Sequence, residues 1–499
     1  MGSKHEKFYP LLQNITQFLL SKGWIYILLL SCLLFFYQLI FHNGIEIGLA
    51  FASIPIAICM FILIINQPYK SFYLFFIANY LLLIISRFVD IKLGISTLIF
   101  SLLMLVVVAM RSIYEKIEWG KTEKAVYALW SIWALYCVAE IFNPNNVQEA
   151  WNIYITMYIV YPFICLILVP LSIKNIKHIE ILLIIWVIFI LVMGIKGYWQ
   201  KNRGFTSAEL YWLYVEGGAR THFIWSGIRY FSFFTDAANY GVNMGMAIVA
   251  FFISFIHTKN YILKLLLFGG IIAAAYGLGI SGTRTAIAVP LAGLCLYIFL
   301  SGSKKTALIG ILSLTIFVVF FAFTTIGDNN QYIKKMRSAF HPTEDASYLV
   351  RLENRQKIAE YMADKPFGYG IGLGGKGDRF KPKELMPIPP DSWLVNVWAD
   401  TGIVGVTLYC LIHIIMFAWC SWILKYRIRN KQLRGLLTAW LCMNAGFFVA
   451  TYGNDVMQYP NAIIVYTGFA LCFAGVHIDK SLAKTETEKE NQEEKSDAV

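Results

Sequence analysis

Three arginines lie at polar breaks in an otherwise strongly apolar chain. Arg229 occurs in GIRYFSFFTDAANYG, Arg284 in GISGTRTA and Arg351 in DASYLVR. A guanidinium group stays charged and offers five donors in a planar fork, which suits two-point binding of a phosphate or pyrophosphate. Charged groups close to membrane depth are costly and by default indicate function. The three arginines therefore predict an anion site.

Each arginine also has a simpler interpretation. Arg229 and Arg351 could be solvated loop residues. Arg284 is harder to explain in this way, because the small polar residues 281–283 interrupt two apolar runs just before it. Such a break resembles the broken helices that form ligand sites in membrane proteins.

Asp391 is the first polar side chain of IPPDSWLVNVWADTGIVG, which leads into a late apolar stretch. A carboxylate near arginines could act as general base for a hydroxyl group, or could pair with an arginine and fix it. An aspartate before Ser-Trp-Leu is also a good helix N-cap. The sequence leaves these interpretations open.

A glycine-rich run, ADKPFGYGIGLGGKG, contains a GxGxxG match at Gly370, Gly372 and Gly375. A dinucleotide fingerprint needs a preceding strand and a following helix, whereas this run follows a predicted amphipathic helix over 348–362. We reject a dinucleotide site and expect either a lip over an active site or a flexible loop. Histidines and cysteines lack metal-ligand spacing, so no metal site is predicted.

These candidates are carried by a chain suited to a membrane. It has 499 residues, 58% hydrophobic and 14% charged, against about 25% charged in soluble domains. Fourteen apolar stretches recur from 24–41 to 461–477, each of about the length that a helix needs to cross a bilayer. We expect an all-α polytopic membrane protein with about 12–14 transmembrane helices. All nine cysteines lie in apolar runs, so no disulfide is expected.

Loop charge predicts the orientation. Lys and Arg gather in the short loops of one side, and Lys92 alone occupies the short loops of the other. Positive side chains resist translocation, so both termini are predicted to be cytoplasmic and two hydrophilic excursions to face outward. The predicted division is a cytoplasmic N-terminus (1–23), N-terminal helices (24–196), a first excursion (197–239), central helices (240–326), a large loop with short helices (327–399), C-terminal helices (400–477) and a disordered cytoplasmic tail (478–499).

The net charge of +12 comes mainly from these cytoplasmic loops. The 327–399 excursion holds eleven basic and nine acidic residues, an excess too small for a nucleic-acid footprint. No nucleic-acid partner is expected, although a local positive patch could face a lipid phosphate or a sugar pyrophosphate.

The blocks, in this order, resemble the O-antigen ligase and O-antigen polymerase superfamily of bacterial membrane glycosyltransferases. The matching pieces are Arg229 followed by F-x-D-x-x-N, S-G-T-R ending at Arg284, Arg351 followed by P-x-G-x-G-x-G, and D-S-W-L from Asp391 followed by T-G-I-V-G. They cover roughly 229–405.

The resemblance implies an inner-membrane enzyme that moves a glycan from undecaprenyl pyrophosphate to an acceptor on the periplasmic face, without a metal or other cofactor. Arg229, Arg284 and Arg351 would bind the pyrophosphate, and Arg284 would help it to leave. The acceptor would be lipid A-core for a ligase, which we expect, or a second carrier-linked glycan for a polymerase. Protein O-glycosylation is a third alternative.

One position departs from the family pattern. Many members have a His-Asn pair where this chain has Pro390-Asp391, and that histidine is the usual candidate for activating the acceptor hydroxyl. Asp391 is therefore our candidate base. His222, His341 and Asp236 are further candidates for binding or activating the acceptor.

The competing classes are a transporter or flippase of lipid-linked sugar and a non-catalytic assembly scaffold. A transporter should place polar residues near the midplane of several helices. Here the polar residues concentrate in the two excursions, with few candidates such as Glu140 inside a span. This distribution favours an enzyme.

Overall fold

The computed structural model describes residues 30, 31, 34, 70–88, 94–114, 123–224, 227–340, 346–374, 380 and 384–497. The chain divides into two units, Met1–Gln67 and Pro68–Val499, and the fold and site below belong to the second. The expected spans 24–41 and 46–65 lie outside the described residues, apart from three positions in the first.

The second unit is helical except for one short hairpin, β1 (Phe223–Ile224) paired antiparallel with β2 (Gly227–Ile228). Its apolar helices are α4 (Ser71–Ser86), α5 (Gly94–Tyr114), α6 (Lys124–Ala139), α7 (Gln148–Ile155), α8 (Tyr161–Ser172), α9 (Ile176–Arg203), α12 (Ala237–His257), α13 (Tyr261–Ser281), α14 (Thr285–Ser301), α15 (Lys304–Phe323), α18 (Trp393–Trp422), α19 (Lys431–Thr451) and α20 (Asn461–Asp497). Short helices in the excursions are α10 (Ser207–Tyr214), α11 (Ala219–His222), α16 (Gln331–Arg337) and α17 (Ala346–Met362).

The predicted membrane fold is confirmed. Within the described ranges, nine helical segments are long and apolar enough to cross a membrane, and three shorter apolar helices accompany them. Every expected span from 70–87 onward coincides with one of these segments, because each apolar stretch has the length that a helix needs to cross a bilayer. The protein is therefore a multi-pass membrane protein.

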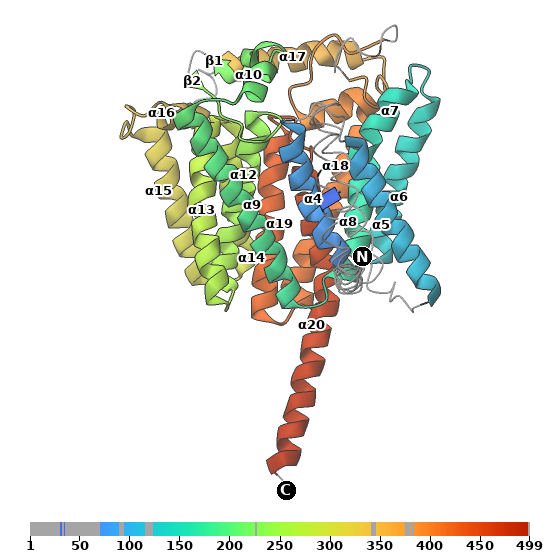
Figure 1. Ribbon diagram of the computed structural model, residues 1–499, viewed down its shortest axis with the longest axis vertical. Helices are drawn as coiled ribbons and strands as arrows, with labels where there is room; N and C mark the ends of the chain where they lie inside the picture. Colours follow the sequence, from blue (N-terminus) through green and yellow to red (C-terminus); the bar gives the residue numbers. More distant parts are fainter. Residues whose placement is uncertain are drawn as a thin grey trace, which may run out of the picture. The chain divides into compact units, whose positions relative to one another are not determined.

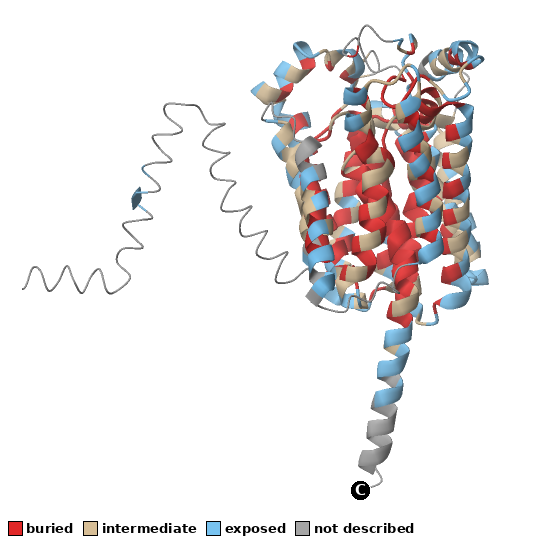
Figure 2. Ribbon diagram, turned by 90° about the vertical axis from the view of Figure 1, so that its right-hand side faces the viewer, coloured by how far each residue is buried: buried red, intermediate tan, exposed pale blue. Residues whose placement is uncertain are grey.

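The centre of the bundle is formed by α12, α19 and α20. The apolar windows of these three helices are 72%, 78% and 89% buried, whereas that of α15 has no buried residue. Figure 2 shows buried residues inside the bundle and exposed residues along its outer helices. The outer faces of a membrane bundle contact lipid, which is as apolar as the side chains themselves, so exposed leucines and phenylalanines there are expected.

Both excursions lie at one end of the bundle, which we call the excursion end, and the C-terminus of α20 points away from the other (Figure 1). The prediction of a disordered tail from residue 478 is corrected by the structure, in which α20 continues as a helix to Asp497. Its Lys, Glu and Ala residues are strong helix formers and extend a helix already fixed in the bundle.

Candidate anion-binding site

A polar cavity of about 230 Å³ lies at the excursion end, where the turn between α13 and α14 meets residues from both excursions. Basic side chains dominate its lining, and no carboxylate occurs among the described lining residues. The basic residues are Arg220, Arg229, Arg284, Lys335 and Arg351. The three arginines singled out in the sequence, which are up to 122 positions apart, thus line one cavity.

Arg229 follows β2 and is held by groups on two elements. Its guanidinium donates to the Thr221 carbonyl at 3.2 Å and to Thr283 Oγ1 at 2.8 Å. The Thr283 hydroxyl in turn donates to the Ala237 carbonyl, which ties the site to the start of α12. Burial lowers the pKa of Arg229 to about 10, with Asp236 acting in the opposite direction. The group is still charged at neutral pH.

Arg284 immediately precedes α14, after a left-handed turn at Gly282 (φ 57°). An added Cβ at Gly282 would lie 2.9 Å from Lys335 Nζ, so both the backbone and the space favour glycine there. Arg284 donates to Ser338 Oγ at 3.3 Å. Burial, and then the charge of Arg351, lower the pKa of Arg284.

Arg351 projects from α17 and donates to Asn454 Oδ1 at 3.3 Å. Asn454 also donates to Thr285 Oγ1 and thereby joins α17 to the start of α14. Burial lowers the pKa of Arg351, while nearby Asp391 raises it. Asn454 lies between α19 and α20, so a third loop completes the cavity.

Sequence reasoning missed Lys335, Asn454 and Arg220. Lys335 is one of eleven basic residues in its excursion, and nothing in its spacing distinguishes it. Asn454 lies outside the 229–405 segment that carried the motifs. A usable signal for Asn454 is the polar triplet Gly-Asn-Asp in a short loop between two apolar runs.

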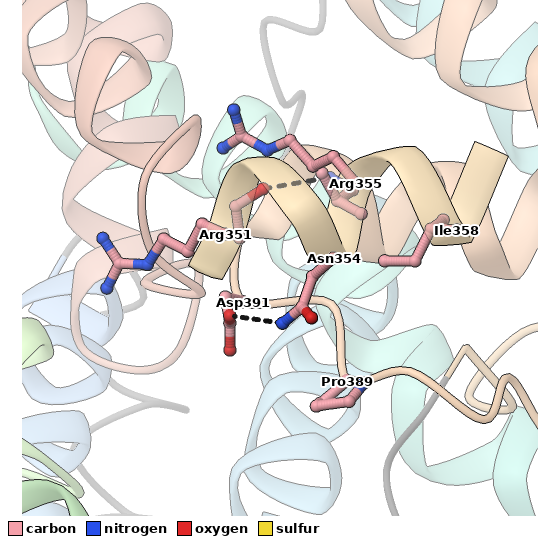
Figure 3. Close-up of a pocket in the computed structure, with 8 residues that line it drawn as sticks. Arg351, Asn354, Arg355, Ile358, Pro389 and Asp391 are labelled. Atoms are coloured by element: carbon pink, nitrogen blue, oxygen red, sulfur yellow. Dashed lines mark hydrogen bonds between the residues drawn. The ribbon is translucent and has the colours of Figure 1, made fainter. Parts of the chain in front are cut away.

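Asp391 does not line the cavity. It lies in a notch of about 10 Å³ with Arg351, Asn354 and Arg355, and its carboxylate accepts from Asn354 Nδ2 at 3.4 Å. Figure 3 shows this pair below α17, with the Arg351 side chain extending away from it. The capping interpretation of Asp391 is wrong, because the N-cap of α18 is Ser392, whose hydroxyl accepts from the Val395 amide.

His222 and Asp236 both hold the start of α12. The Nε2 atom of His222 accepts from the Ala237 amide at 3.1 Å, and its Nδ1 lies 2.9 Å from the Gly218 carbonyl. Burial lowers the pKa of His222 to about 4, so the ring is neutral and can accept that bond. Asp236 caps α12 by accepting from the Ala238 and Asn239 amides. Both residues already have structural partners, and His341 lies outside the described residues.

Part of the chain matches a known protein family. Residues 269–410 match the family described as O-antigen ligase, a range that contains Arg284, Lys335, Arg351 and Asp391. The match supports membership of the O-antigen ligase superfamily. It also supports an activity of the ligase or polymerase type in broad terms. No curated protein matches the chain.

Over its described part, residues 368–374, the glycine-rich run is neither a lip over the cavity nor a flexible loop. The amides of Tyr369 and Gly370 donate to the Ala399 and Asp400 carbonyls. The Gly374 amide donates to Asp400 Oδ1 at 2.7 Å. A Cβ at Gly368 would lie 2.5 Å from the Gly402 nitrogen, so the glycines allow two backbones to touch. Gly375 and Gly377 lie outside the described residues.

Across the described ranges, no group of three or more His, Cys, Asp or Glu residues is placed to hold a metal ion. The chemistry that the cavity supports on its own residues is the binding of a polyanion by fixed cations.

Proposed function

We propose that the protein transfers a glycan from undecaprenyl pyrophosphate to lipid A-core on the periplasmic face of the bacterial inner membrane. The main support for this proposal is a cavity lined by five basic side chains. Its described lining residues include no carboxylate. Cations gathered in a cavity whose described lining lacks a carboxylate repel one another and lose hydration, a cost that a bound anion offsets. A pyrophosphate at the membrane surface matches this charge.

In the proposed reaction an acceptor hydroxyl attacks the anomeric carbon, and the bond to the pyrophosphate oxygen breaks. Negative charge grows on the departing oxygen. Arg229, Arg284 and Arg351 are already in place to stabilise it, so they favour the transition state more than the bound substrate. The hydrogen bonds of Arg229 and Arg351 to Thr283 and Asn454 fix the two guanidinium groups before the donor arrives.

Asp391 is the proposed base for the acceptor hydroxyl. Its carboxylate is exposed and shares the notch with Arg351, which also lines the cavity. An acceptor that approaches across Arg351 would therefore meet a carboxylate next to the donor. The occupied ring nitrogens of His222 favour Asp391 over that histidine.

The periplasmic assignment is supported by loop charge. The connections that enter or leave the opposite end carry Lys174 and Lys177, Lys259 and Lys264, Lys304 and Lys305, and the 425–434 cluster. Basic loops resist translocation, so we place that end in the cytoplasm and the cavity outside.

A polymerase is the alternative, because the same cavity would serve a carrier-linked acceptor. Transport is less well supported, since the basic residues gather at one end of the bundle and not along a route through it. Protein O-glycosylation would use the same donor chemistry.

The test is reconstitution of purified protein with undecaprenyl-pyrophosphate-linked glycan and either lipid A-core or more carrier-linked glycan, with a chelator present. A ligase should attach the glycan to lipid A-core, and a polymerase should instead lengthen the carrier-linked product on a gel. Failure with both acceptors would contradict the proposal. Transfer that needs an added metal would contradict its metal-free form.

A further inference from the structure

Lys335 differs from the other cations of the cavity. It lies in the last turn of α16 and only 7% of its surface is exposed. Its Nζ atom has no hydrogen-bond partner among the described residues, whereas the guanidinium groups of Arg229, Arg284 and Arg351 each have at least one. A buried ammonium with three donors and no acceptor is costly unless a ligand supplies the acceptor.

The charges around Lys335 explain its properties. Burial lowers its pKa to about 7, and the charges of Arg229 and Arg284 act in the same direction. Tyr230, Tyr276 and Tyr332 are further titratable groups by this part of α16 and interact with one another. The Lys201 ammonium of α9 lies 4.6 Å from the centre of the Tyr332 ring.

The nearest acid in sequence is Asp328, which pairs with Arg337. Arg220 and Arg351 complete the basic lining of the cavity. An entering anion would therefore meet an amine that can carry or release a proton near neutral pH.

The proposed reaction changes the charge of the donor. A carrier-linked glycan is a diester of pyrophosphate, with one negative charge on each phosphate and no proton that titrates near neutrality. Breaking the bond to the sugar leaves a monoester, whose second pKa is about 6. The departing oxygen therefore gains one charge or takes one proton. Arginine cannot release a proton in a protein, whereas a buried lysine can.

We infer that Lys335 is the proton donor to the leaving pyrophosphate, an inference that rests on the proposed function. When the bond between the anomeric carbon and oxygen breaks, its electron pair stays on the oxygen, which takes a proton from the Lys335 ammonium. The acceptor hydroxyl loses its proton to the base. After product release the base gives its proton to solvent, and solvent restores the proton on Lys335.

A binding experiment tests the titration without any transfer. Dimethyl pyrophosphate, a symmetrical diester with two charges, would be titrated into the detergent-solubilised protein at pH 7.5 in buffers of different ionisation enthalpy. Binding should take up a fraction of a proton, because the anion raises the pKa of Lys335. Lys335→Arg should bind without uptake. Lys334→Arg, a change at an exposed neighbour outside the cavity, should behave like wild type.

A kinetic experiment tests the proton donor. Lys335→Arg keeps the positive charge, so the KM for the donor should change little, while kcat falls about 100-fold or more and loses its decline at alkaline pH. Lys335→Met should have both a lower kcat and a weaker affinity for the donor. This variant replaces Lys335→Arg in the test if the arginine variant does not fold. Near-normal kcat with the alkaline decline intact in Lys335→Arg, or unchanged proton uptake, would overturn the inference. Absence of transfer by the wild type would instead overturn the proposed function.

Discussion

The excursion end buries charge in two different ways. At the glycine-rich run, Asp400 is fully buried, and its carboxylate accepts from the Tyr158 hydroxyl at 2.9 Å and from the Gly374 amide at 2.7 Å. In the cavity, five basic side chains come together without a carboxylate among the described lining residues.

The contrast separates scaffold from site. A buried charge whose lone pairs are used by its neighbours fixes the fold, as Asp400 fixes the glycine run against α18. Lys335 is buried and Arg229, Arg284 and Arg351 are half-buried. Cations that lose hydration and repel one another are kept at a cost, and a ligand of opposite charge offsets it. The contrast also explains why the glycine run, the more conspicuous motif, is structural in its described part.

The largest expected effect is at Arg284. Both Arg284→Ala and Arg284→Lys should lower glycan transfer by about 1,000-fold, since each removes the two-point contact to the leaving group. Both variants should remain folded and membrane-inserted by size-exclusion chromatography. Full activity of the lysine variant would refute two-point recognition of the pyrophosphate.

The next effect concerns the base. Asp391→Asn should lower kcat by about 100-fold while the KM for the donor changes much less. The comparison of kcat and KM is needed because Asp391 also acts on Arg351. An unchanged kcat would remove Asp391 from the reaction.

Asp400→Ala tests the scaffold side of the comparison. It leaves the Tyr158 hydroxyl and the Gly374 amide without their acceptor, and should lower the free energy of unfolding by about 2 kcal/mol. Thermal unfolding in detergent would measure this loss, with binding of dimethyl pyrophosphate largely retained. Lost binding at an unchanged Tm would place Asp400 in the site instead.

Lys335→Met should have the opposite effect on the ligand-free protein. The folded-state pKa of Lys335, about 7, lies below its ordinary value of 10.5. The penalty is therefore complete below pH 7 and fades as pH rises toward 10.5. The variant should gain on the order of 2 kcal/mol at pH 6 and less at pH 9, as measured by thermal unfolding. Equal gains at both pH values would mean that the buried charge is not the cause.

Asn454→Ala should have the smallest effect. Arg351 and Thr285 each lose one hydrogen-bond partner, so the KM for the donor should rise about fivefold with little change in kcat. A matched change outside the cavity is Asn202→Ala, whose amide donates to the Tyr198 carbonyl of its own helix and whose side chain also contacts Tyr276. Equal effects of the two changes would indicate that Asn454 does not position Arg351.

The class of protein and its membrane helices follow from the sequence alone. Apolar stretches of spanning length form helices wherever they occur, because unpaired backbone groups are prohibitively costly in lipid. The sequence also identified Arg229, Arg284 and Arg351, since a guanidinium beside an apolar run is unusual enough to be noticed.

Which residues share the cavity follows only from the way the helices and loops pack together. Lys335 carries no local pattern, and Asn454 carries only the polar triplet around it. Both reach the cavity only because α16 and the loop between α19 and α20 pack beside the turn at Gly282. The structure likewise assigned His222 and Asp236 to the start of α12 and the cap of α18 to Ser392. Periodicity reports the burial of a residue within its own helix, but the sum of charges in a cavity depends on distances between segments remote in the chain.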